Sequence, residues 1–211
     1  GFINFRLKPA TITAHLAALT TDVRLGVPQV PQRRLVIDFS SPNVAKPMHV
    51  GHIRSTILGD SLARIGRFLG HTVIADNHIG DWGTQFGMLC LAWKTMLDKA
   101  ALDRDPIAEL ERIYKIQNER CKSDATQLDA ARAELVKLQS GDAENLGIWR
   151  EMIRLSQVQF DTIYARLGIR FDMTRGESSY NEWLSDVVSD LAAKSIARES
   201  DGAFCVFSDG S

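Results

Sequence analysis

The fold of this chain is decided by one stretch, which runs Leu35-Val36-Ile37-Asp38-Phe39, then Ser40-Ser41-Pro42-Asn43-Val44-Ala45-Lys46-Pro47, then Met48-His49-Val50-Gly51-His52. Its first part is a short apolar, β-branched run bounded by turn residues, which is typical of a buried strand. The second part predicts a loop, because each proline disfavours helical geometry in the residue before it. Pro47 also suits the position just before a helix, which the pattern predicts from about Val50 to about Leu69.

Two histidines, His49 and His52, therefore lie where a strand gives way to the start of a helix. Such a start directs unpaired backbone N–H groups and the positive end of a helix dipole at one point, so it attracts phosphate. Gly51 lets a ligand come close to the backbone. Both histidines fall on one face of the first turn, where each can donate a ring N–H to a phosphoryl oxygen. An isolated His-x-Gly-His more often only caps or packs a helix, so the surrounding residues must decide.

The elements that follow indicate an α/β fold. Residues 71–75 predict a second strand, and a strand, helix and strand in this order form a parallel sheet with a right-handed crossover. Residues 76–83 predict a polar, glycine-bearing loop at the end of that strand, where ligands of open α/β sheets bind. A helix from about Thr84 to about Leu97 is expected next.

Charged, helical segments occupy the middle of the chain, near residues 106–122, 123–138 and 143–167. We interpret them as an insertion of two or three antiparallel helices over about residues 103–167. Acidic and basic residues alternate there, which favours a solvated face over a nucleic-acid groove. After the insertion, residues 169–172 predict a third strand and residues 181–198 a further helix.

A second candidate cluster follows that third strand, over Phe171 to Tyr180. Glu177 lies there next to a glycine, and a carboxylate at the end of a parallel strand can pair bidentately with a guanidinium. The alternative is that Glu177 caps the N-terminus of the next helix, which the residues alone favour.

Two motifs carry a resemblance to a known family. The stretch from Phe39 to Thr56 resembles the first signature motif of arginyl-tRNA synthetases, which are class I aminoacyl-tRNA synthetases. The long form of this motif, with Ser-Pro-Asn and an upstream lysine, is far more specific than the histidine pair alone. Gly176-Glu177-Ser178 and Tyr180 resemble a second family motif, although Ser179 stands where the family usually has an aromatic residue. The resemblance implies a Rossmann-like parallel sheet with a helical insertion, truncated at both ends.

The resemblance also implies a pocket for L-arginine. Ser41 and Asn43 match positions that contact the amino acid, and His52 matches a further contact in the same pocket. Glu177 matches the glutamate that contacts the arginine side chain.

ATP is the second ligand that the resemblance implies. His49 and His52, beside Gly51, match the pair that faces ATP. Lys46 matches a lysine that supplies positive charge to the phosphates, whereas an ordinary exposed loop lysine is the alternative. The candidate catalytic residues are thus His49, His52 and Lys46. Mg²⁺ would accompany the ATP, and the resemblance implies neither a metal site in the protein nor a tightly bound cofactor.

A third motif, Asn77-His78 with Gly80-Asp81-Trp82-Gly83, resembles a family motif near the active site. This motif does not assign a role to each of its residues. Trp82 suits a position in the hydrophobic core as well as one near the active site.

The implied reaction is attack of the arginine carboxylate on the α-phosphorus of ATP, followed by transfer of the arginyl group to tRNA(Arg). Positioning and electrostatic stabilisation carry the first step. Two other interpretations remain open. Another His-x-Gly-His adenylyl-transferring enzyme would explain His49 and His52 but not Ser41-Pro42-Asn43. A non-catalytic, synthetase-like RNA-binding module is favoured by the lack of the family's second, lysine-bearing signature.

Composition limits the remaining possibilities. The 211 residues are 45% hydrophobic and carry a formal net charge of −1, so a sizeable core is expected and any nucleic-acid contact must be local. The one candidate patch consists of Arg54, Arg64 and Arg67, which can equally solvate a helix face. No apolar run approaches the roughly 20 residues of a membrane span. The three scattered cysteines, Cys90, Cys121 and Cys205, favour reduced thiols, and a cytoplasmic monomer is expected.

Both ends of the chain look cut. Residues 1–7 predict a strand without a partner, and residues 201–211 predict a turn, a strand and a final turn. In the family comparison, residues 1–32 correspond to the tail of an N-terminal appended domain with its linker, and residues 33–211 to a partial catalytic domain. The lysine-bearing loop and the anticodon-binding domain are expected beyond Ser211, so the chain alone is predicted to be nearly inactive.

Overall fold

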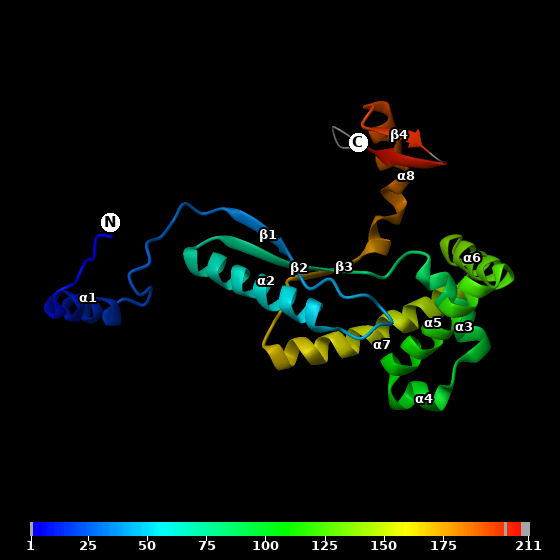
Figure 1. Ribbon diagram of the computed structural model, residues 1–211, viewed down its shortest axis with the longest axis horizontal. Helices are drawn as coiled ribbons and strands as arrows, with labels where there is room; N and C mark the ends of the chain where they lie inside the picture. Colours follow the sequence, from blue (N-terminus) through cyan, green and yellow to red (C-terminus); the bar gives the residue numbers. More distant parts are fainter. Residues whose placement is uncertain (1, 201, 208–211) are drawn as a thin grey trace.

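A three-stranded parallel sheet organises the chain (Figure 1). The structure is a computed structural model that describes residues 2–200 and 202–207. Strand β1 (Arg34–Asp38) pairs with β2 (Thr72–Ile79), and β2 pairs with β3 (Met173–Gly176), in the order β1-β2-β3. Because all three run parallel, their carboxyl ends lie at one edge, and the expected α/β parallel sheet is confirmed.

Helix α2 (Val50–Leu69) connects β1 to β2 and packs on one face of the sheet (Figure 1). Two glycines make the close approach possible: a Cβ at Gly59 would overlap the Phe39 ring, and one at Gly66 would lie 2.9 Å from Val73. The helix ends at Gly70, whose φ of 99° is the left-handed geometry that glycine adopts readily. The helix predicted over residues 50–69 is confirmed.

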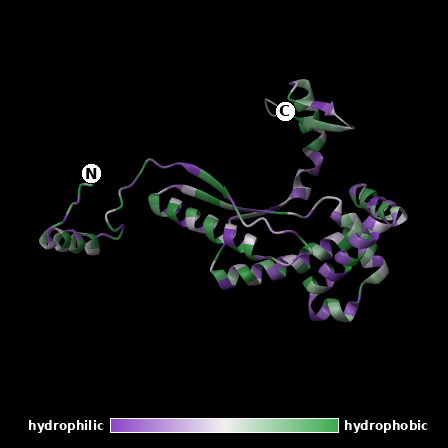
Figure 2. Cartoon of the chain, in the orientation of Figure 1, coloured by the Kyte–Doolittle hydropathy of each residue, from purple (hydrophilic) through white to green (hydrophobic). Residues whose placement is uncertain are grey.

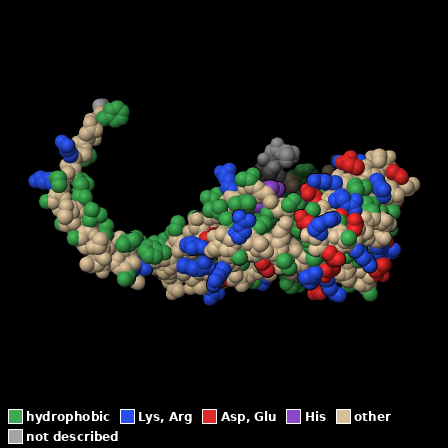
Figure 3. All heavy atoms as spheres, turned by 90° about the horizontal axis from the view of Figure 1, so that it is seen from below, with side chains coloured by type: hydrophobic (Ala, Val, Ile, Leu, Met, Phe, Trp, Pro, Cys, Tyr) green, Lys and Arg blue, Asp and Glu red, His purple; other side chains and the backbone are tan. Residues whose placement is uncertain are grey.

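Helix α3 (Gln85–Met96) follows β2, and the short α4 (Lys99–Arg104) follows α3. The insertion expected over about residues 103–167 contains α5 (Pro106–Ser123), α6 (Ala125–Gln139) and α7 (Ala143–Leu167). Aspartates begin four of these helices, since Asp98, Asp105, Asp124 and Asp142 each accept a backbone N–H of the first turn. Hydrophobic and hydrophilic residues alternate along them (Figure 2), and acidic and basic side chains mix on the surface (Figure 3). The four predicted helical segments are confirmed as α3, α5, α6 and α7, and the short α4 is an addition that the sequence pattern did not indicate.

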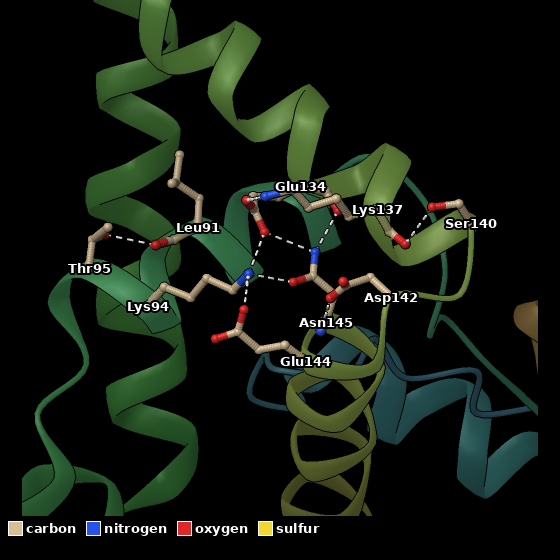
Figure 4. Close-up of polar contacts among 9 residues, drawn as sticks. All are labelled: Leu91, Lys94, Thr95, Glu134, Lys137, Ser140, Asp142, Glu144 and Asn145. Carbon is tan, nitrogen blue, oxygen red and sulfur yellow. Dashed lines mark hydrogen bonds and ion pairs between the residues drawn. The ribbon is translucent and has the colours of Figure 1, made fainter.

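A half-buried polar cluster fastens α3 to α6 and α7 (Figure 4). The Lys94 ammonium donates to Glu134 at 2.7 Å and to Asn145 at 2.6 Å, and pairs with Glu144 at 2.9 Å. Asn145 in turn donates to the backbone and the carboxylate of Glu134 at 2.8 and 2.9 Å. Because each charge has a partner, the cluster fixes how the helices meet.

Helix α7 leads back from the insertion to the sheet (Figure 1). Its buried Phe160 and Tyr164 join the same core as Phe39. The ring of Phe171 packs on Tyr164 and Phe39, with centroid distances of 4.9 and 4.6 Å. The insertion and the strand region therefore share one hydrophobic core.

Three expectations about the strands and the last helix are wrong. Strand β2 continues to Ile79 through residues expected to form a loop, and β3 covers Met173–Gly176 and not residues 169–172. Ile169 and Phe171 are apolar because they pack in the core after α7, while the backbone N–H of Asp172 already bonds to Ala75. The helix expected over residues 181–198 is split into a 3₁₀ helix η1 (Glu177–Trp183), helix α8 (Leu184–Ala193) and strand β4 (Ala197–Ser200).

The two ends lie away from the sheet (Figure 1). Residues 2–7 form no strand, contrary to expectation, and helix α1 (Pro9–Thr21) follows them without a buried side chain. Strand β5 (Ala203–Val206) is confirmed and pairs antiparallel with β4. Residue 1, the start of the turn at residue 201 and the final turn over residues 208–211 lie outside the described residues. Among the residues described, no helix has the length and apolar character to cross a membrane.

Candidate active site

The loop between β1 and α2 has an unusual backbone. Ser40, Ser41 and Ala45 have φ angles of 79°, 49° and 62°, in the left-handed region that side chains other than glycine seldom occupy. Each such residue costs about 1–2 kcal/mol, so the surroundings must hold the loop in this shape. Strain of this kind is typical of ligand-binding loops on a rigid scaffold.

The carboxyl end of β2 holds this loop from one side. The backbone N–H of Ser41 donates to the Asn77 side chain at 3.1 Å. Further along, Val44 donates to the carbonyl of Gly80 at 3.0 Å, and Gly80 donates back to Pro42 at 2.9 Å. A side chain at Gly80 would overlap the Asn43 amide, so only glycine permits this contact.

The histidine pair begins α2 as a reciprocal cap. His49 Nδ1 accepts from the backbone N–H of Gly51 at 3.1 Å, and His52 Nδ1 accepts from that of His49 at 3.3 Å. A ring nitrogen that accepts a hydrogen bond carries no proton, so each neutral imidazole bears its proton on Nε2. Burial lowers the pKa of His52, and neighbouring His49 lowers it further. Capping and phosphate contact are thus compatible, because capping leaves an Nε2–H donor on each ring.

Lys46 is half-buried and not a freely solvated loop lysine. Its ammonium lies over the Tyr114 ring of α5, 4.7 Å from the ring centroid. A cation–π contact of this kind stabilises a charge by about 0.5–1 kcal/mol and directs the lysine toward the helical insertion.

Glu177 is exposed directly after β3, as the first residue of η1. The turn that carries it is held by Asp81, whose carboxylate accepts from the Ser178 backbone at 2.8 Å and hydroxyl at 2.6 Å. Gly176 is required here, because a Cβ would overlap that carboxylate. Gly176 is the N-cap residue of η1, and Glu177 is the acidic residue of its first turn, so the structure leaves open both the recognition of a guanidinium and the stabilisation of the helix start. Ser179, at the usual aromatic position, is exposed and donates to the Gly176 carbonyl at 2.7 Å.

Asp81 is the site residue that sequence reasoning left without a role. It is buried and connects the end of β2 to the Glu177 turn. Its backbone carbonyl also accepts from the Trp149 indole of α7 at 2.8 Å. Trp82 packs edge-on against Trp149 at 5.9 Å, which confirms the core interpretation of Trp82. The sequence did carry a sign of this role, because Asp81 is an acidic residue in the short segment between Gly80 and Gly83, directly after a strand.

His78 points to the other face of the sheet from Asn77, since alternate side chains of a strand face opposite sides. Its Nδ1 lies 3.3 Å from Asp76 and 3.9 Å from Asp38, and its Nε2 bonds to the Tyr180 hydroxyl. His78 therefore lies on the face opposite to Asn77, where the Asp38 carboxylate also accepts from the Ser41 hydroxyl at 3.5 Å.

The arginines of α2 make specific contacts within the chain. Arg64 donates to Asp60 at 2.6 Å and to the Gly168 carbonyl at 2.6 Å, and Arg67 donates to Asp172 at 2.7 Å. They fasten α2 to the segment between α7 and β3. Two of the three residues of the candidate basic patch are thus already engaged.

The end of β2 brings the candidate residues together. It holds the Ser41–Asn43 segment through Asn77 and Gly80, and the Glu177 turn through Asp81. Lys46, His49, Gly51 and His52 continue the same loop into α2. In the described residues, no group of three His, Cys, Asp or Glu side chains is placed to hold a metal ion.

A phosphate-attracting helix start and a carboxylate at neighbouring ends of a parallel sheet are typical of α/β domains that bind nucleotides. Sequence comparison specifies this class further. Residues 15–211 match the family described as tRNA synthetases class I (R), catalytic domain. The chain belongs to the arginyl-tRNA synthetase family of class I synthetases.

Curated relatives named arginine–tRNA ligase cover the chain almost completely. The protein from Fusobacterium nucleatum is 46% identical over 209 residues, which are 99% of this chain and 37% of the relative. That from Thermobifida fusca is 46% identical over 216 residues, covering 100% of this chain and 37% of the relative. The chain thus spans little more than a third of the length of these relatives.

Solved structures agree with the fold. Arginyl-tRNA synthetase from Plasmodium falciparum superimposes with a TM-score of 0.67 at 34% identity, over 84% of this chain and 30% of that protein. The Thermus thermophilus arginyl-tRNA synthetase matches with a TM-score of 0.65 over 96% of this chain and 34% of that protein. At 23% identity, the second match supports the fold alone.

Proposed function

We propose that this chain contributes the arginine pocket and the histidine half of the ATP site to an arginine–tRNA ligase. The observation that carries the proposal is the joint anchoring of the Ser41–Asn43 segment and the Glu177 turn on the end of β2. It places an exposed carboxylate and a phosphate-attracting helix start at the same edge of the sheet. Family membership favours this function over that of other His-x-Gly-His enzymes.

The arginine pocket comprises Ser41, Asn43, His52 and Glu177. Glu177 pairs with the guanidinium of the substrate, since a carboxylate accepts two parallel hydrogen bonds from this group. Ser41 and Asn43 contact the amino-acid end on the strained loop, which brings the carboxylate of arginine toward the start of α2.

The ATP site comprises Lys46, His49, Gly51 and His52. The Nε2–H groups of the two histidines donate to phosphoryl oxygens as charge builds on them, and Lys46 leaves its contact with Tyr114 to supply positive charge. Mg²⁺ enters with the ATP phosphates as part of the substrate. Arginyl-adenylate then reacts with tRNA(Arg), and the working protein is a cytoplasmic monomer with residues 33–211 in its catalytic domain.

A calorimetric titration of the chain with arginine tests the pocket, with lysine, cysteine and ATP as comparison ligands. Selective, saturable binding of arginine supports the proposal. Binding of another of these ligands in preference to arginine contradicts it.

Pyrophosphate exchange by the full-length protein, with tRNA present, tests the reaction itself. Exchange that depends on arginine supports the ligase function. Its absence with arginine, alongside intact tRNA binding, favours a non-catalytic RNA-binding module.

A further inference from the structure

Helix α7 holds the strained loop in addition to β2. Two of its side chains reach the loop, and both are buried: Tyr164 is 5% exposed and Ser156 is fully enclosed. The Tyr164 hydroxyl lies 2.7 Å from the Ser40 hydroxyl, and the Ser156 hydroxyl accepts from the backbone N–H of Ala45 at 2.9 Å. The two contacts flank the loop at two of its three residues of positive φ.

The Tyr164 hydroxyl contacts both Asn77 and Ser40. Asn77 accepts from the Ser41 backbone N–H through Oδ1, so its Nδ2 is the atom that donates to the Tyr164 hydroxyl, at 3.1 Å. The hydroxyls of Tyr164 and Ser40 share a further hydrogen bond, in which either oxygen can be the donor. Hydrogen bonds therefore run from Ser41 through Asn77 and Tyr164 back to Ser40, two adjacent loop residues.

This closed chain explains how two consecutive serines stay at positive φ. Left-handed geometry persists only where the surroundings over-determine it. Removing one member of a buried chain leaves another polar group without a partner, at a cost similar to the strain in the loop. The Tyr164 hydroxyl is therefore placed to decide whether the loop keeps its shape.

We propose that Tyr164 is a positioning residue for the arginine pocket, acting through Ser40 and Asn77 to hold Ser41 and Asn43 in the geometry that meets the amino acid. The inference rests on the proposed function. It gives the helical insertion a role in the active site, because α7 is its last helix and the family motifs do not include Tyr164. His49 and His52 are held by their own reciprocal cap, so the effect is specific to arginine over ATP.

Tyr164→Phe is the test variant, because it removes only the hydroxyl and keeps the ring against Phe171. Thr162→Val is the matched control, because it removes an exposed hydroxyl from the same helix. Among the described residues, this hydroxyl bonds to the carbonyl of Val158 alone. Both substitutions preserve the volume of the side chain.

Hydrogen–deuterium exchange of the loop amides in the full-length protein is the first measurement. We expect the Ser41 amide to exchange about tenfold faster in Tyr164→Phe, the equivalent of one lost hydrogen bond, with no change in Thr162→Val. Unchanged exchange at residues 40–46 in Tyr164→Phe overturns the anchoring. This result is independent of whether the protein activates arginine.

Pyrophosphate exchange is the second measurement, with the Michaelis constants for arginine and ATP determined separately. We expect the KM for arginine to rise about tenfold in Tyr164→Phe and the KM for ATP to change less than about twofold. A faster loop with unchanged KM for arginine, or an equal rise in both constants, overturns the positioning role. No arginine-dependent exchange in the unmodified protein contradicts the proposed function instead.

Discussion

The backbone N–H of His49 donates to Nδ1 of His52 at 3.3 Å, so the second histidine caps the helix that the first one begins. This relationship links the folding of the site to its chemistry. Capping uses Nδ1 of each ring and leaves Nε2–H for a ligand. Protonation of His52 would turn its acceptor into a donor and break the contact.

The pH dependence of His52 follows from this contact. Burial, then the proximity of His49, lowers the pKa of His52 below its usual value of 6.5. A depressed histidine pKa contributes stability above pH 6.5, which is lost as the pH falls through the folded-state value. We expect an NMR titration of the His52 ring to show a midpoint below 6.5.

The His49→Ala variant serves as the control for that titration. We expect the midpoint of His52 to rise only in part, because burial is the larger cause and His49 the smaller one. A midpoint at or above 6.5 in the unmodified chain would show that Nδ1 of His52 is not a neutral acceptor.

Gly176→Ala tests the connection between Asp81 and the Glu177 turn. A Cβ would overlap the Asp81 carboxylate, so the turn must move and lose the contacts of Ser178. We expect a loss of about 2–3 kcal/mol in the free energy of unfolding.

Gly147→Ala is the control, because nothing lies within 4 Å of a Cβ at that position. In the interior of a helix, replacing glycine by alanine stabilises the protein by about 0.5–1 kcal/mol. Denaturant unfolding measures both, and equal effects would contradict the close approach.

The β1–loop–α2 unit could be predicted from sequence because its signals are local. Prolines, glycines and an apolar run act within a few residues of one another, and α2 occurs at the predicted residues. The end of β2 was missed because Asp76 and Asn77 are polar, although both are buried. The Asn77 amide bonds to Ser41 and Tyr164, and the Asp76 carboxylate lies 3.3 Å from His78, so protein groups and not water surround both side chains.

The partners of the site loop could not be predicted for a different reason. Tyr164 bonds to Ser40 across 124 residues, and no periodicity within α7 distinguishes it from an ordinary core residue. Similarly, β3 is short and lies at the edge of the sheet, so its register is set by pairing with β2 and not by its own composition. Long-range contacts of this kind determine how the active site is held.

Acid sensitivity is expected from the cluster around Lys94. Burial alone would raise the pKa of Glu134, but hydrogen bonds from Lys137, Lys94 and Asn145 outweigh it and lower the pKa from 4.5 to about 2. A depressed carboxyl pKa contributes stability above pH 4.5, and this stability is lost as the pH falls toward 2. We expect Glu134→Gln to flatten the decline of the unfolding midpoint over this range. A decline identical to that of the unmodified protein would exclude Glu134 as its source.

The cysteines should differ in reactivity. Burial raises the pKa of Cys90 to about 11, and Cys121 is also buried, whereas Cys205 is partly exposed. Because the thiolate is the reactive form, we expect iodoacetamide to label Cys205 alone in the folded protein at pH 8. Mass spectrometry of the alkylated peptides measures this, and denaturation should expose all three thiols. Early labelling of Cys90 would contradict the packing of α3.

Glu177→Gln tests the proposed recognition of the arginine side chain. The amide keeps the shape of the side chain but loses the charge and one of the two acceptors that a guanidinium needs, so we expect the KM for arginine to rise about a hundredfold. The KM for ATP should change less than about threefold, since Glu177 lies after β3 and the histidines lie after β1. Glu182→Gln is the matched control, because it removes an exposed carboxylate from the same 3₁₀ helix. Equal weakening of both substrates by Glu177→Gln would indicate that the residue only stabilises its turn, and an equal effect in Glu182→Gln would indicate a general effect of charge.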